Sequence, residues 1–112
     1  MLELDADSFD GMQLKGHPGV VGVCFHATWC GFCRSFLPLF KASEAEAPVP
    51  FALADVTSFE DPRWDSFSLG TVPTLVIFEN GAPVWRRNAP LGIGLREKDL
   101  QAFLAAARRP RP

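Results

Sequence analysis

The feature that most constrains the fold is a short apolar run that passes directly into a helical pattern. Residues 20–25 read Val-Val-Gly-Val-Cys-Phe, which predicts a strand buried on both faces of a sheet. Phe32, Phe36 and Phe40 then recur at four-residue spacing, which predicts a helix that extends to about residue 47. A buried strand followed at once by a helix is typical of an α/β sheet with helices on both faces.

The rest of the chain continues this alternation of strands and helices. Asn80-Gly81 is the strongest two-residue signal for a hairpin. Pro38 removes one amide from the helix that contains it and predicts a kink there. The other expected elements are a short helix capped by Asp7 or Ser8 and extending to about residue 15, a strand over 50–56, a short helix from Asp61-Pro62 to Gly70, strands over 75–78 and 84–86, and a closing helix with Leu100, Phe103, Leu104 and Ala107 on its apolar face.

These elements predict one α/β domain over residues 1–107. Its central mixed sheet has four to five strands and is flanked by about four helices. Residues 108–112 are basic and are expected to form a disordered tail. With 47% hydrophobic residues among 112, including ten Phe and three Trp, the chain has enough apolar material for one core.

Composition and charge also exclude several classes of function. The net charge of −2 gives no electrostatic reason to expect a nucleic-acid partner. No apolar run approaches the roughly 20 residues of a membrane-spanning helix, and the acidic start, residues 1–5, lacks the pattern of a secretion signal. We therefore expect a cytoplasmic monomer without a membrane partner. Three cysteines argue against a disulfide scaffold, so a close pair indicates catalysis or metal binding.

That close pair is Cys30 and Cys33, at the junction between the strand and the helix. Free amides and the helix dipole favour a negatively charged sulfur at Cys30. A thiol with a pKa of about 8.5 is only about 3% thiolate at pH 7, whereas a pKa of about 7 gives roughly half. Cys33, one turn later, can then attack a mixed disulfide at Cys30 and release the reduced substrate. The spacing makes that second step intramolecular.

Several segments, in order along nearly the whole chain, resemble the thioredoxin family: Ala27-Thr28-Trp29-Cys30-Gly31-Phe32-Cys33, Pro38, Asp55, Thr71-Val72-Pro73-Thr74 and Phe78-Glu79-Asn80-Gly81. The resemblance implies the thioredoxin fold and a thiol–disulfide oxidoreductase that acts on protein disulfides. In a reducing cytosol it would reduce them, with Cys30 as nucleophile and Cys33 as resolving thiol. It would need no metal or organic cofactor, and a thioredoxin reductase or an equivalent donor would resupply electrons.

The resemblance also implies a substrate-binding surface around the thiols. Pro73 is expected to be cis and to face the active-site disulfide, and the Val72 backbone to pair with extended substrate. The family places a glycine after an apolar residue on this surface, which Gly92 or Gly94 matches. Three residues of this surface lie within two positions of Cys30 in the sequence. Trp29 is expected to act as a lid and a packing residue, and Gly31 and Phe32 are expected to add contact surface.

The chain departs from the family at two places near the thiols. Gly31-Phe32 stands where thioredoxins typically have Gly-Pro, so the family's redox potential cannot be transferred. Cys24 occupies the position of the family's buried carboxylate, and Phe51 that of its lysine partner. Replacing a buried ion pair as a unit is often neutral or stabilising. Without that carboxylate, we hypothesise that Cys33 loses its proton to water or to the departing substrate thiolate.

Alternatives remain open for individual residues. Cys24 is interpreted as a small core residue, with a third redox sulfur as the alternative. His26 is interpreted as a packing or surface residue, with tuning of Cys30 through its charge as the alternative. For the cysteine pair the alternatives are an incidental pair or half of a zinc site, but His17 and His26 are the only histidines and no second pair completes four ligands.

Two other functions fit the same fold. A disulfide oxidant or isomerase would differ in reduction potential, about −120 mV for a strong oxidant against about −270 mV for a reductant. An adaptor would use the fold for binding, and its thiols would be incidental. In that case wild type and Cys30→Ser would reduce insulin at equal rates.

Overall fold

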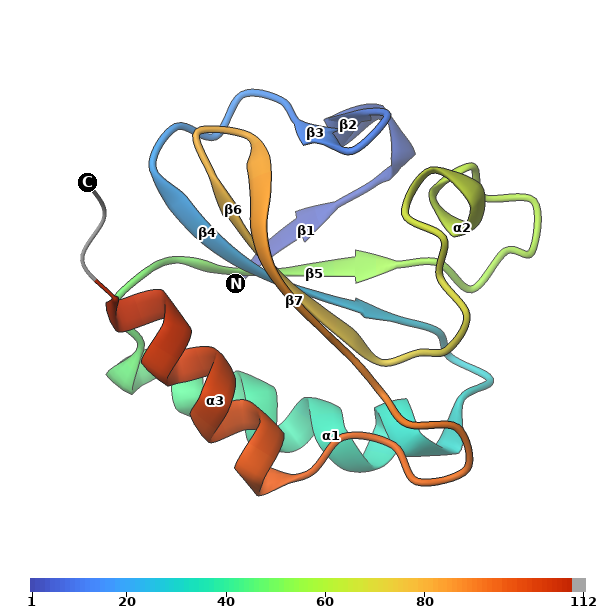
Figure 1. Cartoon of the computed structure of the whole chain (residues 1–112). Helices are drawn as coiled ribbons and strands as arrows, with labels where there is room; N and C mark the ends of the chain where they lie inside the picture. The colour runs from blue at the N-terminus through green and yellow to red at the C-terminus, as the bar shows by residue number, and fades with distance from the viewer. Residues whose placement is uncertain (110–112) are drawn as a thin grey trace.

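The computed structural model, which describes residues 1–109, contains a five-stranded mixed sheet. In spatial order its strands are β1 (Leu2–Leu4), β5 (Phe51–Asp55), β4 (Val20–His26), β6 (Thr74–Glu79) and β7 (Ala82–Asn88) (Figure 1). The first three are parallel, and β6 and β7 run antiparallel to their neighbours. The predicted mixed α/β sheet is confirmed, with β4 at its centre.

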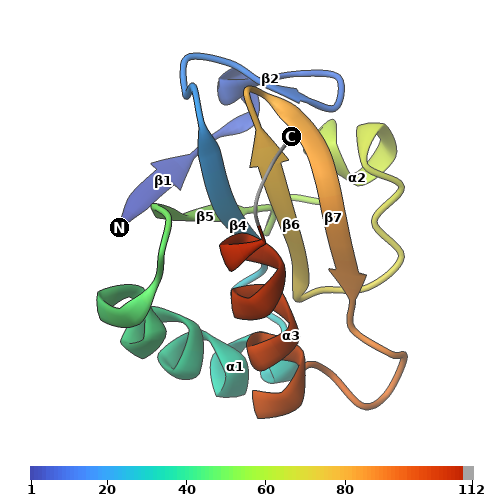
Figure 2. The same ribbon diagram turned by 60° about the vertical axis from the view of Figure 1, so that its left-hand side comes forward.

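Helices and a small hairpin cover the sheet. Two helices, α1 (Gly31–Ala42) and α3 (Glu97–Arg108), lie together against one face (Figures 1 and 2). Opposite them lie α2 (Arg63–Ser66) and the hairpin of β2 (Phe9–Asp10) and β3 (Gln13–Leu14). Two short 3-10 helices, η1 (Ala6–Ser8) and η2 (Ser43–Glu46), complete the elements. No helix among residues 1–109 is both long enough and apolar enough to span a membrane.

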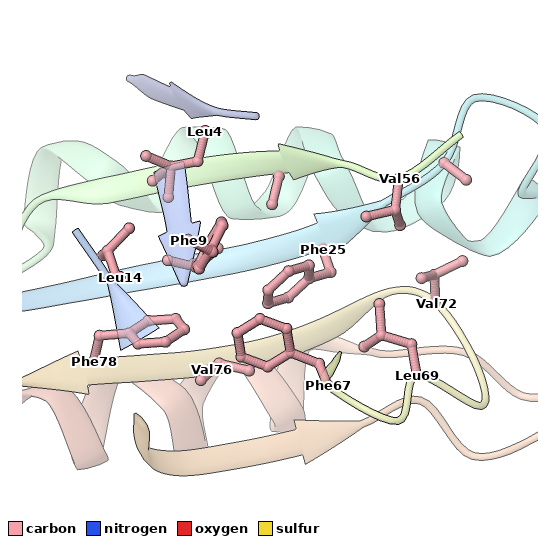
Figure 3. Packing of buried hydrophobic residues seen from close by; sticks show 14 of the residues in the cluster. Leu4, Phe9, Leu14, Phe25, Val56, Phe67, Leu69, Val72, Val76 and Phe78 are labelled. Carbon is pink, nitrogen blue, oxygen red and sulfur yellow. The ribbon is translucent and has the colours of Figure 1, made fainter. Parts of the chain in front are cut away.

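The central strand β4 is buried on both faces, as its apolar run predicts. Val23 and Phe25 belong to the core cluster beneath α2 and the small hairpin (Figure 3). Cys24, between them, belongs to the cluster that α1 and α3 build with Phe36 and Phe40. Since alternate strand residues point to opposite faces, one residue of β4 lies in each core in turn, and α1 is held against the strand that precedes it.

An aromatic layer joins α1, α3 and the sheet. The ring of Phe103 on α3 lies 5.8 Å from that of Phe40 and 5.3 Å from that of Phe51, and Trp85 closes the layer at 5.9 Å. A Cβ atom at Gly22 would lie only 2.4 Å from the tip of the Phe103 ring. Glycine at this position therefore allows α3 to pack directly on β4.

The N-terminal segment corrects the sequence prediction of a helix from residue 7 or 8 to 15. Only η1 is helical, and Asp5 rather than Asp7 or Ser8 caps it by accepting the Ser8 amide. Phe9 and Leu14 then face each other across the β2–β3 hairpin, and both are buried. A spacing of five residues does not put two side chains on one helical face, whereas the hairpin turns both into the core.

Other boundaries differ less. The helix predicted to reach residue 47 ends at Ala42 and continues as η2. Residues 1–109 contain three α-helices, where about four were expected. Strand β1 was not predicted, because its three residues offer only Leu4 to the core. The Asn80-Gly81 turn is confirmed, with φ of 49° and 87°. Residues 110–112 of the predicted tail lie outside the described residues, and α3 includes Arg108.

Gly22→Ala should lower the free energy of unfolding by about 1–3 kcal/mol, the usual cost of overpacking a core. The buried Phe103 ring has neighbours on three sides and cannot move away from the added methyl group. Gly70→Ala is the matched control, since a Cβ there meets no atom within 4 Å. Urea unfolding of both variants checks this, and equal stability would contradict the close packing.

Candidate functional site

Cys30 occupies the N-cap of α1, the position just before the first helical residue. Its Sγ accepts a hydrogen bond from the Cys33 backbone N–H at 3.1 Å. Its thiol donates to the Val72 carbonyl oxygen at 3.4 Å. The sulfur therefore has a partner in both protonation states, and the free amides and dipole of the helix terminus favour the anionic one.

Cys33 lies one turn deeper and is fully buried. Burial, and after it the hydrogen bond with the Cys30 side chain, raises the pKa of Cys33 to about 12. The charge of Cys30 is a smaller contribution of the same sign. Cys33 is thus protonated at neutral pH.

A groove of about 370 Å³ lies beside Cys30. None of the side chains that line it is charged: Trp29, Cys30, Gly31, Phe32, Trp64, Gly70, Thr71, Val72, Ala89, Pro90, Leu91 and Gly92. The Val72–Pro73 peptide bond is cis, as expected. Val72 lines the groove, whereas Pro73 is buried behind it. The groove thus combines the Cys30 sulfur, the segment before the cis-proline and the loop after β7.

Trp29 and Trp64 line one side of the groove, and Phe59 packs with them outside the lining. The sequence analysis did not assign Trp64 or Phe59 to the site. The Trp29 ring stacks on Phe59 at 5.2 Å and on Trp64 at 6.1 Å. Its Nε1–H donates to the Thr57 carbonyl at 2.9 Å, which fixes the ring. Both partners are 30 or more positions after Trp29 in the sequence, so local motifs could not predict this cluster.

Buried Arg63 holds the segment that carries this side of the groove. Its guanidinium pairs with Asp61 at 2.8 Å and donates to the backbone carbonyls of Leu4 and Asp55. These bonds join the ends of β1 and β5 to α2. The sequence analysis did not identify this role, because a single arginine in a polar turn is typical of an exposed residue.

The opposite side is formed by Phe32 and the loop after β7. Gly92 is exposed and lines the groove, whereas Gly94 is buried against the Phe32 side chain. Of the two glycines that the sequence left open, Gly92 is therefore the one on the groove surface. Gly31 also lines the groove, next to Cys30.

The two possible modulators lie outside the groove lining. Cys24 is fully buried, and burial, followed by the charges of Cys33 and Cys30, raises its pKa well above the ordinary value. His26 ends β4 and is half-buried. Burial lowers the pKa of His26 by more than the charge of Asp55 raises it, so the neutral ring is favoured at pH 7. Tuning of Cys30 by the charge of His26 stays the alternative to a packing or surface role.

Residues 1–109 bring together no group of three or more His, Cys, Asp or Glu side chains that fits a metal ion.

Comparisons with known proteins agree with this geometry. The family model described as Thioredoxin matches residues 1–106. The thioredoxin of Chlamydia trachomatis is 35% identical over 82 residues, which cover 72% of this chain and 74% of the relative.

Solved structures are similar as well. The thioredoxin of Fasciola hepatica is 31% identical, with a TM-score of 0.66 over 80% of this chain and 82% of that one. Thioredoxin f2 of Chlamydomonas reinhardtii has a TM-score of 0.75 over 99% of both chains at 23% identity, which supports the fold alone.

Cys24→Asp should speed the reaction of Cys33 with a disulfide held at Cys30. A carboxylate beneath Cys33 would accept its proton, and a positioned base typically contributes about 100-fold or more. Mixing the reduced protein with Ellman's reagent loads Cys30 with a coloured thiol, and the second phase of colour release measures its displacement by Cys33.

The wild-type rate of this second phase should rise from pH 6 to pH 9, because Cys33 is mostly protonated throughout that range. The dependence should be weaker in Cys24→Asp. Cys24→Asn, of the same size but unable to take the proton, is the control. Identical pH profiles for the Asp and Asn variants would count against the hypothesis that Cys33 now lacks a protein base.

Proposed function

Because this chain belongs to the thioredoxin family of thiol–disulfide oxidoreductases, we propose that it reduces protein disulfides, with Cys30 as the attacking sulfur and Cys33 as the resolving one. One observation carries this assignment. The Cys30 sulfur accepts an amide N–H at the helix terminus and adjoins the open groove, whereas Cys33 is buried behind it.

In the first step the Cys30 thiolate attacks one sulfur of the substrate disulfide. A Cys30–substrate disulfide forms, the substrate S–S bond breaks, and the other substrate sulfur leaves as a thiolate that takes a proton. The apolar groove accommodates the chain on either side of the attacked bond. The low charge of the lining limits hydration around the sulfurs, which strengthens the helix-terminus interaction.

In the second step Cys33 loses its proton and attacks the Cys30 sulfur. The Cys30–Cys33 disulfide forms, and the second substrate thiolate leaves, so two electrons have passed to the substrate. The mixed disulfide removes the negative charge and the thiol hydrogen bond of Cys30, and both had raised the pKa of Cys33. Burial is unchanged, but these two contributions are gone. Cys33 therefore ionises more readily once the mixed disulfide has formed.

The cycle needs a separate electron donor to restore the dithiol. A thioredoxin reductase or an equivalent dithiol donor fits this role, since it would meet the same groove and the Cys30 sulfur that adjoins it. We also propose that the protein works in a reducing compartment such as the cytoplasm. The odd, small number of cysteines supports this, because proteins of oxidising compartments more often pair their cysteines in structural bonds.

The reduced protein should accelerate the reduction of insulin by dithiothreitol, followed as turbidity. Cys30→Ser should abolish the acceleration, because it removes the sulfur that accepts the helix amide. Cys33→Ser should form the mixed disulfide and then stop, so a stable adduct with an insulin chain is expected in non-reducing electrophoresis. Equal rates for wild type and Cys30→Ser would show that the thiols do not act as proposed.

A further inference from the structure

Phe32, which stands where thioredoxins typically have Pro, is in direct contact with the loop after β7. A Cβ atom at Gly94 would lie 2.6 Å from Cδ1, 2.8 Å from Cγ and 2.9 Å from Cβ of Phe32. The backbone of Gly94 therefore supports the base of the Phe32 side chain, not only its flexible end. Phe32 cannot avoid a larger residue at position 94 by a small ring rotation.

The loop that supports Phe32 is itself fixed to the site. The amides of Ile93 and Gly94 both donate to the Pro90 carbonyl and close a turn. Ala89, at the start of the loop, donates its amide to the Pro73 carbonyl and accepts the Thr71 hydroxyl at 2.7 Å. The loop thus has a fixed position relative to the segment that carries the cis-proline.

The surface formed in this way is apolar and accessible. Phe32 is 43% exposed and Leu91 is 87% exposed, and both line the groove next to Cys30. The polar side-chain groups of Trp29, Trp64 and Thr71 in the lining already have hydrogen-bond partners inside the protein. The Trp29 and Trp64 ring N–H groups donate to the carbonyls of Thr57 and Val56, and the Thr71 hydroxyl donates to Ala89.

We propose that Phe32 and Leu91, held in place by Gly94, form a specificity wall that selects disulfides flanked by a bulky apolar side chain. This inference rests on the proposed function and names its substrate class. An aromatic or aliphatic side chain beside the attacked cysteine would bury its surface against this wall, whereas a polar one would lose water without gaining a hydrogen-bond partner. Such cysteines become accessible in unfolded or partly folded protein chains.

The test uses two peptide disulfides of equal charge. Each is a homodimer of one short peptide, with Phe on both sides of its cysteine in the first and Ser in the second. The pre-reduced protein is mixed with each peptide, quenched with acid and quantified, which gives a second-order rate constant without an electron donor. The ratio of the two rate constants is the readout, because any change in the intrinsic reactivity of Cys30 cancels in it.

Wild-type protein should prefer the Phe-flanked peptide by about tenfold, as expected for partial burial of one large apolar side chain. Phe32→Ala should reduce the preference to about twofold. Leu39→Ala is the matched control and should keep the full ratio, because Leu39 is a similarly exposed apolar residue of α1 outside the groove lining. A wild-type ratio near one, or an unchanged ratio in Phe32→Ala, would overturn the inference.

Gly94→Ala tests the positioning role separately. It should lower the ratio as Phe32→Ala does, although it removes no apolar surface. Gly92→Ala matches its backbone strain, since φ is 74° at Gly92 and 78° at Gly94, but its Cβ meets no atom within 4 Å. Gly94→Ala should therefore cost more stability in urea unfolding, and a full ratio in this variant would contradict the positioning role.

Failure of the proposed function would look different. In that case wild-type protein would reduce neither peptide nor insulin, and both proposals would be overturned. Reduction of insulin and of both peptides at equal rates would leave the proposed function intact and overturn the specificity wall alone.

Discussion

The hydrogen bond from the Cys33 amide to the Cys30 sulfur depends on the position of one helix end, and the rest of the structure supports that position. Helix α1 begins where β4 ends, and its buried Phe36 and Phe40 pack in the same cluster as Cys24 of that strand. The contact of Phe103 with Gly22 brings α3 against the same layer. The N–H groups of the first turn are consequently aimed at the cysteine that precedes them.

The two sulfurs differ because the same turn places them at different depths. Cys30 adjoins an uncharged groove, and Cys33 is enclosed by the core. Burial keeps Cys33 protonated until Cys30 has given up its charge to a bond with substrate. The order of the two chemical steps thus follows from burial and from one hydrogen bond, without a buried carboxylate beneath the pair.

Much of the fold and both thiols could be predicted from the sequence, because their signals are local. The apolar run of β4, the spacing of the phenylalanines in α1 and the Asn80-Gly81 turn each specify their own structure within a few residues. The N-terminal hairpin was predicted wrongly as a helix, because the pairing of Phe9 with Leu14 is decided by the core above β4 and not by the local capping pattern.

The residues around the groove were even harder to predict from local sequence patterns. Phe59 and Trp64 reach Trp29 only through the path of the chain after β5, which buried Arg63 fixes with bonds to two strand ends. The choice between Gly92 and Gly94 depends on where a turn places the Phe32 side chain. These contacts join residues that are far apart in the sequence, so short-range spacing could not predict them and the three-dimensional structure was needed to find them.

Selective alkylation of the reduced protein at pH 7 tests the central claim most directly. Iodoacetamide labelling, located by mass spectrometry, should modify Cys30 first and several-fold faster than free cysteine, and should leave Cys24 and Cys33 unlabelled on that time scale. Concentrated urea should abolish the difference, because it removes the helix terminus. Labelling of Cys30 in the native protein no faster than in urea would contradict the account.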